Sequence, residues 1–208
     1  DGGDVVIPAT LENLPVHIIG SDAFSGCINL TSVVIPDSVA NIGSRAFDGC
    51  TNLTAVTIPD SVQEIGVDAF CDTPWLDSFS EEFVVVGDGV LIDYNGTKTE
   101  VTIPDTVKYI SSGFYGNDNI THVSIPNTVT CIGDVAFSHC MYLTEVVIPD
   151  SVIEIKNGAF WGCGNLTSVT VPNSVKIIDG DALASPWLDA QTEEFVIVGD
   201  GVLLDYNG

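Results

Sequence analysis

Six cysteines supply the most reactive side chains of this 208-residue chain. Cys27 and Cys50 are 23 residues apart, and Cys140 and Cys163 share that spacing, whereas the other two cysteines do not. No C-x₂-C pair is present, so the spacing does not favour a zinc site. Cysteine packs into protein cores as a small hydrophobe, and we therefore expect structural thiols. Disulfides within the two spaced pairs remain the alternative.

Three histidines, His17, His122 and His139, lie far apart in the chain and at different points of the repeat described below. The chain contains no G-x-S-x-G, H-E-x-x-H or glycine-rich phosphate loop. The segment Gly87-Asp88-Gly89 lacks the acid spacing of an EF-hand and is typical of a hairpin turn. We therefore predict that the chain is not an enzyme and has no catalytic residues, cofactor or metal.

The chain is strongly acidic, with 29 Asp and Glu against 5 Lys and Arg and a formal net charge of −24. Nucleic acids bind through Lys and Arg that neutralise phosphates, and an anionic membrane would repel this charge, so neither partner is expected. The acidity is expected to keep the chain soluble and monomeric. An acidic face for Ca²⁺ or for a basic partner is the alternative. A Ca²⁺ ladder would use a repeated position filled by Asp37, Asp60, Asp105, Asn127, Asp150 and Asn173.

The pattern Asn-x-Thr recurs and matches the acceptor sequence for N-glycosylation. Its repetition has a structural explanation, because Asn hydrogen-bonds to turn backbone and Thr favours the start of a strand. We therefore expect these asparagines to be turn residues. They are Asn29, Asn52, Asn119 and Asn165.

A unit of about 23 residues organises the whole chain. A hydrophobic residue followed by proline returns in steps of 22, 23 or 45 residues from Ile35 onward, and the step of 45 contains a disguised copy. Such a period indicates a solenoid, because each unit must stack on its neighbours to bury its apolar face. These hydrophobic-proline pairs are Ile7-Pro8, Ile35-Pro36, Ile58-Pro59, Ile103-Pro104, Ile125-Pro126, Ile148-Pro149 and Val171-Pro172.

One coil can be followed from Leu53 to Phe70. The segment from Leu53 to Ile58 has the pattern L-x-x-L-x-L and predicts a strand, which Pro59 ends because proline donates no ladder hydrogen bond. The segment from Val62 to Ile65 predicts a short second strand or a helical turn. A phenylalanine then fills the centre of the coil, and stacked coils place these rings in a core column. The column contains Phe24, Phe47, Phe70, Phe114, Phe137, Phe160 and Leu183.

The disguised coil contains a second, longer repeat. Residues 75–96 recur as residues 187–208 with 17 of 22 positions identical, and both copies predict a β-hairpin around a glycine turn. We expect one solenoid domain over residues 1–208, with hairpin-containing coils near 74–102 and 186–208. The end of the chain matches Tyr94-Asn95-Gly96, which continues into a further coil, so we predict a fragment of a longer protein. No stretch approaches 18 apolar residues, and no membrane insertion is expected.

The repeated motifs resemble those of the BspA-like leucine-rich repeat family of bacterial and protist surface proteins. The similarity is carried by I-P-D-S-V at 35–39, I-G-x-x-A-F at 42–47 and G-C-x-N-L-T at 49–54. Gly113-Phe114 lacks the alanine of this motif, and Leu183 replaces the phenylalanine. The resemblance implies a right-handed, horseshoe-like solenoid with a parallel sheet on its concave face, and short strands or 3-10 turns fit the convex side. It also implies surface display and binding of host or neighbour-cell molecules, with no defined catalytic residues.

Three functions are compatible with this pattern. We predict a cell-surface or secreted binding or adhesion module that recognises an extracellular protein or glycan through the concave sheet. A structural stalk is the first alternative, and a polysaccharide-active β-helix enzyme is disfavoured because the coils carry no long loop for a site. The outward-facing strand positions predict a broad, shallow contact surface. They are Ser32, Val34, Ala55, Thr57, Glu100, Thr102, His122, Ser124, Glu145, Val147, Ser168 and Thr170.

Overall fold

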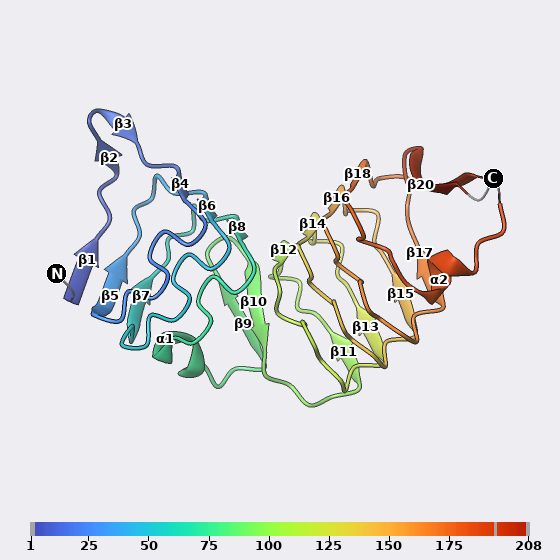
Figure 1. The fold of residues 1–208 in the computed structure, drawn as a ribbon, viewed down its shortest axis with the longest axis horizontal. Coiled ribbons are helices and arrows are strands. Elements are labelled where there is room, and N and C mark those ends of the chain that lie inside the picture. The colour runs from blue at the N-terminus through green and yellow to red at the C-terminus, as the bar shows by residue number, and fades with distance from the viewer. Residues whose placement is uncertain (1–2, 194, 207–208) are drawn as a thin grey trace. The chain divides into compact units, whose positions relative to one another are not determined.

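The computed structural model describes residues 3–193 and 195–206. The chain divides into two compact units, Asp1–Asn95 and Gly96–Gly208, and short parallel strands stack side by side in each (Figure 1). This arrangement confirms the predicted β-solenoid, since helix is almost absent from the described residues. One domain over 1–208 stays a prediction, and the hairpin coil predicted near 186–208 includes residues 194, 207 and 208, which lie outside the described ranges.

The first unit contains two parallel sheets, two antiparallel hairpins and one helical turn. The longer-stranded sheet has the order β1 (Gly3–Val6), β5 (Leu30–Val34), β7 (Ala55–Thr57). The second sheet has the order β4 (Ile18–Ile19), β6 (Asn41–Ile42), β8 (Glu64–Ile65). The hairpins are β2 (Thr10–Leu11) with β3 (Leu14–Pro15), and β9 (Phe83–Val86) with β10 (Val90–Tyr94), and the helix is α1 (Pro74–Asp77).

The second unit repeats this plan with one more coil in each sheet. One parallel sheet has the order β11 (Glu100–Thr102), β13 (His122–Ser124), β15 (Glu145–Val147), β17 (Ser168–Thr170). The other contains β12 (Tyr109–Ile110), β14 (Cys131–Ile132), β16 (Glu154–Ile155) and β18 (Ile177–Ile178) in that order. Helix α2 (Pro186–Asp189) and the hairpin β19 (Phe195–Val198) with β20 (Val202–Tyr206) follow.

The proline step turns the chain from one sheet to the other. In the second coil the Val39 amide donates to the Pro36 carbonyl at 3.0 Å, which closes a β-turn over Asp37 and Ser38. The same bond joins Val62 to Pro59 at 3.1 Å. The valine that ends each turn is fully buried. The predicted end of the strand at proline is therefore confirmed, and the short strands that follow confirm the predicted second strand.

The predicted phenylalanine column forms the core of each unit. In the first unit Phe24, Phe47 and Phe70 stack with ring centroids 5.0 and 5.1 Å apart and nearly parallel planes. In the second unit Phe137 stacks on Phe114 at 4.9 Å and on Phe160 at 5.3 Å. The ladder spacing of the strands sets these distances, because each ring belongs to one coil.

The hairpin predicted in the disguised coil is present as β9–β10, and its turn requires glycine. Gly87 has φ +56°, and a Cβ atom there would lie 2.5 Å from the Val62 carbonyl oxygen. Gly199 has φ +58°, and a Cβ atom there would lie 2.5 Å from the Val175 carbonyl oxygen. The two long repeats therefore require glycine at the same position of the turn for the same reasons. Before the first hairpin, Trp75 of α1 is buried, whereas its equivalent in α2, Trp187, is half-buried.

Candidate ligand-binding surface

The strand pattern places the predicted contact residues on the outside of the longer-stranded sheets. In β13 the middle residue Val123 is buried, whereas His122 and Ser124 on either side are exposed. Adjacent residues of a strand point to opposite faces, so a buried Val fixes its two neighbours outward. The β11, β15 and β17 strands show the same exposed-buried-exposed pattern.

In the second unit, parallel register joins eight of the predicted residues into two straight columns. Each residue of one strand lies opposite its counterpart on the next, without a bulge. The first column is Glu100, His122, Glu145 and Ser168, and the second is Thr102, Ser124, Val147 and Thr170.

The first column is polar along its whole length. His122 accepts or donates a hydrogen bond through Nδ1 with the Thr121 hydroxyl at 3.0 Å, and the Ser168 hydroxyl donates to Glu145 at 3.5 Å. These side chains are exposed, so the column offers solvated hydrogen-bonding groups rather than a buried catalytic constellation.

In the first unit Val34, Ala55 and Thr57 are exposed as predicted, but Ser32 is only half-exposed. The Ser32 hydroxyl donates to the Asp4 carboxylate at 2.6 Å, and the Thr31 hydroxyl donates to the same oxygen at 3.1 Å. These bonds lower the pKa of Asp4. Ser32 thus lies on the sheet face at half exposure, and Asp4 of β1, which stands beside it in the sheet, occupies its hydroxyl.

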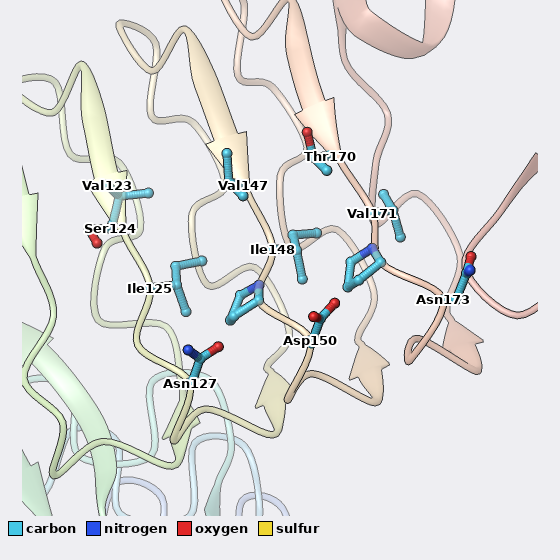
Figure 2. Close-up of a pocket in the computed structure, with 12 residues that line it drawn as sticks. Val123, Ser124, Ile125, Asn127, Val147, Ile148, Asp150, Thr170, Val171 and Asn173 are labelled. Atoms are coloured by element: carbon cyan, nitrogen blue, oxygen red, sulfur yellow. The ribbon is translucent and has the colours of Figure 1, made fainter.

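A shallow groove of about 770 Å³ runs along the edge of the second unit's sheet where the strands end (Figure 2). Three coils line it, and each supplies the last strand residue, the apolar residue before proline and the polar residue of the turn. We call it the sheet-edge groove. The residues labelled in Figure 2 are Val123, Ser124, Ile125, Asn127, Val147, Ile148, Asp150, Thr170, Val171 and Asn173.

The groove combines an apolar floor with a regular row of polar turn groups. Val147 is 55% exposed at its centre, and parallel register places it between Ser124 and Thr170. Asp150 lies between two turn asparagines, Asn127 and Asn173, so carboxylate and amide groups alternate from coil to coil. An extended polymer with a polar backbone and apolar substituents could contact both features at each coil.

The acidic position considered for Ca²⁺ does not gather ligands. Within residues 3–193 and 195–206, three side chains of the types that bind metals bring their ligand atoms together, and these are Asp48, Cys71 and Asp72. None of these belongs to the predicted acidic column. A Ca²⁺ site needs six to eight converging oxygens, and a ladder along the acidic column stays a prediction.

The cysteines of the repeat column hydrogen-bond to the previous coil. The thiols of Cys50 and Cys140 each donate to a phenylalanine carbonyl oxygen at 3.1 Å, and Cys163 does the same. Burial raises the pKa of Cys140 to about 12 and that of Cys163 to about 11. All six cysteines are thiols in this structure. Their bonds support the structural role expected from the sequence.

The Asn-x-Thr repeats behave as turn residues where the structure shows their bonds. The amide of Asn52 donates to the Ile28 carbonyl at 2.6 Å, and that of Asn165 donates to the Met141 carbonyl at 2.8 Å. Each bond links one coil to the coil before it. These bonds confirm the structural explanation for Asn52 and Asn165.

Sequence reasoning missed a row of rings, two exposed and one half-buried, on the turn that precedes the strands of the second unit. His139 packs edge-on against Tyr115 with centroids 5.8 Å apart, and against Trp161 at 4.6 Å. We call these three residues the aromatic ridge. The residue two places after each column phenylalanine was the available signal, because it is glycine at 116 and 162 but histidine at 139.

The geometry defines a class of protein, a leucine-rich repeat solenoid built from stacked parallel coils. Six copies of the pattern described as BspA type Leucine rich repeat region match residues 17–85 and 93–190. The chain therefore belongs to the BspA-type leucine-rich repeat family. A search among curated proteins gives no matching sequence.

Several solved bacterial structures are similar. A leucine-rich repeat protein of T. pallidum shares 30% identity over 85% of this chain and 72% of its own, with a TM-score of 0.40. One from Bacteroides ovatus shares 28% identity over 86% of this chain and 48% of its own, with a TM-score of 0.44. The pneumococcal vaccine antigen PcpA shares 21% identity over 81% of this chain and 51% of its own, with a TM-score of 0.48. The chain thus spans about half the length of the last two.

The described residues contain no helix with the length and apolar character needed to cross a bilayer.

Proposed function

We propose that this chain is a non-enzymatic binding module that recognises an extended extracellular protein or glycan through the sheet-edge groove and the columns beside it. The observation that carries the proposal is the groove of about 770 Å³ shared by three consecutive coils. A repeated groove suits a repeated ligand, because each coil adds a similar weak contact and the contacts act together.

The residues of this surface support binding rather than catalysis. His122 and Glu145 are both exposed and belong to a column that faces solvent. Acid–base catalysis needs groups held within reach of a bound substrate in a site that excludes water. An open strip of short polar side chains fits recognition better. We propose cell-surface or secreted localisation on the same basis, together with the family to which the chain belongs.

A stalk that spaces other domains is the second candidate, and the Val34 and Val147 side chains argue against it. Both are exposed apolar residues on the outer face of a sheet, at 40% and 55% exposure. A passive spacer gains nothing from exposed valines among polar neighbours, whereas a contact surface gains affinity from them.

The test is binding to an array of extracellular-matrix proteins and polysaccharides with two matched variants. Val147→Lys places a charge at the centre of the groove, and Ile153→Lys makes the same change at a 48% exposed position of the same coil outside the groove. We expect Val147→Lys to abolish capture that the wild type shows and Ile153→Lys to retain it. Equal capture by both variants would exclude the groove, and no capture by the wild type would favour the stalk.

Charge reversal at His122 and Glu145, with Ser124→Glu added, tests the neighbouring columns. These residues are exposed, so the triple variant is expected to fold and to lose binding. A ligand whose affinity ignores these changes but responds to variants of the turn near Asp48 or Asp134 would contradict the assignment of the sheet face.

A further inference from the structure

We propose a second binding site on the opposite edge of the same sheet, in which the aromatic ridge and Asp189 hold an arginine side chain of a basic partner protein. Tyr115, His139 and Trp161 lie on the turns that lead into β13, β15 and β17, whereas the sheet-edge groove begins where those strands end. The two surfaces therefore share coils but no residues.

The two outer rings of the ridge are exposed although a coil core lies beside them. Tyr115 is 57% exposed and Trp161 is 47% exposed, each directly follows a buried column phenylalanine, and His139 between them is half-buried. Two exposed aromatic side chains joined by a half-buried imidazole form a patch, and such patches mark interaction sites. Tyr and Trp also lose little conformational freedom on binding, which suits them as anchors.

His139 occupies a backbone conformation that neighbouring coils give to glycine. Its φ is +59°, and the equivalent residues Gly116 and Gly162 have φ +67° and +74°. The same backbone occurs at the non-glycine Asp72, two residues after Phe70, so His139 keeps the turn of the repeat and adds a ring to it. The imidazole of His139 contacts both Tyr115 and Trp161, so the three rings form a continuous row.

A hollow of about 260 Å³ lies beside Trp161 and has one charged wall. Asp189 of α2 lines it, and the remaining residues are largely small, including Gly162, Gly164 and Pro186. The hydroxyl of Ser185, which also lines it, already donates to the Leu183 carbonyl at 3.0 Å. The hollow therefore offers an aromatic surface and a carboxylate but few other hydrogen-bonding groups.

This combination fits a guanidinium group better than a sugar. A guanidinium stacks on an aromatic face and donates a forked pair of hydrogen bonds to a carboxylate, and the hollow has one of each. A sugar ring carries several hydroxyl groups that would find a single acceptor in Asp189. Residues 96–208 contain 14 acidic and 4 basic side chains, so the surrounding field also attracts a cation. The Trp187 amide of α2 donates to the Leu166 carbonyl at 2.9 Å, which holds this helix against the turn that leads into β17.

The experiment measures binding of fluorescent octa-arginine to the whole chain at 150 mM NaCl, where screening weakens the contribution of distant charges. Trp161→Ala and Asp189→Asn are each expected to weaken binding about fivefold or more, as loss of a cation–π contact or an ion pair predicts. The controls are Ile153→Ala, an exposed apolar residue outside the ridge, and Asp181→Asn, which makes the same charge change as Asp189→Asn but does not line the hollow. Both controls are expected to bind as the wild type does.

Several results would overturn the proposal. Equal losses in Asp189→Asn and Asp181→Asn would mean that only the overall charge attracts the peptide. Unchanged binding in Trp161→Ala would show that the ridge is not part of the site. If Trp161→Ala fails to fold, the affinity of Asp189→Asn for octa-arginine tests the proposal instead. Binding of neutral oligosaccharides that depends on Trp161, with octa-arginine showing no such dependence, would identify a glycan site instead.

Discussion

Removal of the Phe47 ring should destabilise the first unit more than any single surface change. Phe47 is fully buried and stacks on Phe24 at 5.0 Å and on Phe70 at 5.1 Å. A buried Phe→Ala change costs about 3–5 kcal/mol from lost transfer free energy and the cavity left behind. Each stacked pair adds about 0.5–1.5 kcal/mol. We expect Phe47→Ala to fall at the upper end of the 3–5 kcal/mol range.

Phe24→Ala is the matched control, because it makes the same chemical change at the end of the column. Phe24 is half-buried and stacks on one phenylalanine instead of two. Its replacement should therefore cost less than half as much as that of Phe47. Urea unfolding monitored by circular dichroism gives both free energies, and a changed slope with urea would show that coils unfold separately.

The outcome that would refute this reasoning is an equal loss in Phe47→Ala and Phe24→Ala. It would mean that stacking along the column adds nothing to the burial of each ring. Ser32→Ala completes the series, since its hydroxyl donates to Asp4. We expect a small destabilisation for this one exposed-sheet position and none at Thr57, because the residue opposite Thr57 on the previous strand is Val34, whose side chain accepts no hydrogen bond.

Three further predictions follow from the backbone and from the pKa shifts. Val135 has φ +50° although it is β-branched, so Val135→Gly should raise the free energy of unfolding by about 1 kcal/mol in urea titrations. Burial raises the pKa of Asp93 above its usual value, so its ionised form opposes folding at pH 7; Asp93→Asn should raise the melting temperature there, and the difference should shrink as pH falls through the folded-state pKa towards 3.8. The raised pKa values of Cys140 and Cys163 predict that a thiol reagent at pH 8 modifies the exposed Cys27 quickly and these two only after unfolding, as mass spectrometry of digests would show.

Those parts of the fold that repeat were predictable from the sequence. The proline that ends each strand and the phenylalanine of each coil recur at one spacing, and stacking converts spacing directly into columns. The outward direction of His122 and Ser124 followed from the buried Val123 between them. Periodicity succeeds here because each of these residues interacts with its own equivalent in the next coil.

The contact between Ser32 and Asp4 shows where that reasoning was applied too narrowly. Asp4 precedes Ile7-Pro8 by the same three residues that separate Ser32 from Ile35-Pro36. The alignment of the first coil therefore placed an acceptor beside the serine, and the parallel register of β1 with β5 bears this out. The depth of the sheet-edge groove had no such signal, because it depends on how far the turn side chains extend.

The aromatic ridge was harder to predict because its members do not occupy one column. Tyr115 and Trp161 each stand one residue after a phenylalanine, whereas His139 stands two residues after one. They meet because the left-handed backbone at His139 turns its ring into the row formed by the other two. A contact between different positions of the repeat needs the turn geometry as well as the period.

The separation of core and surface positions explains how one coil can carry both proposed binding surfaces. Inward residues such as Phe137 and Cys140 hold the stack together and are the same residue types in the next coil, Phe160 and Cys163. The turn between them also carries a position that differs between coils, the half-buried His139, where the next coil has Gly162. The equivalent turn of the first unit carries Asp48 where the second carries Trp161, so the two turn surfaces differ although the fold of the coils is the same. The ridge proposed as a binding site is therefore made of positions that differ between coils, whereas the sheet-edge groove is made of positions that repeat.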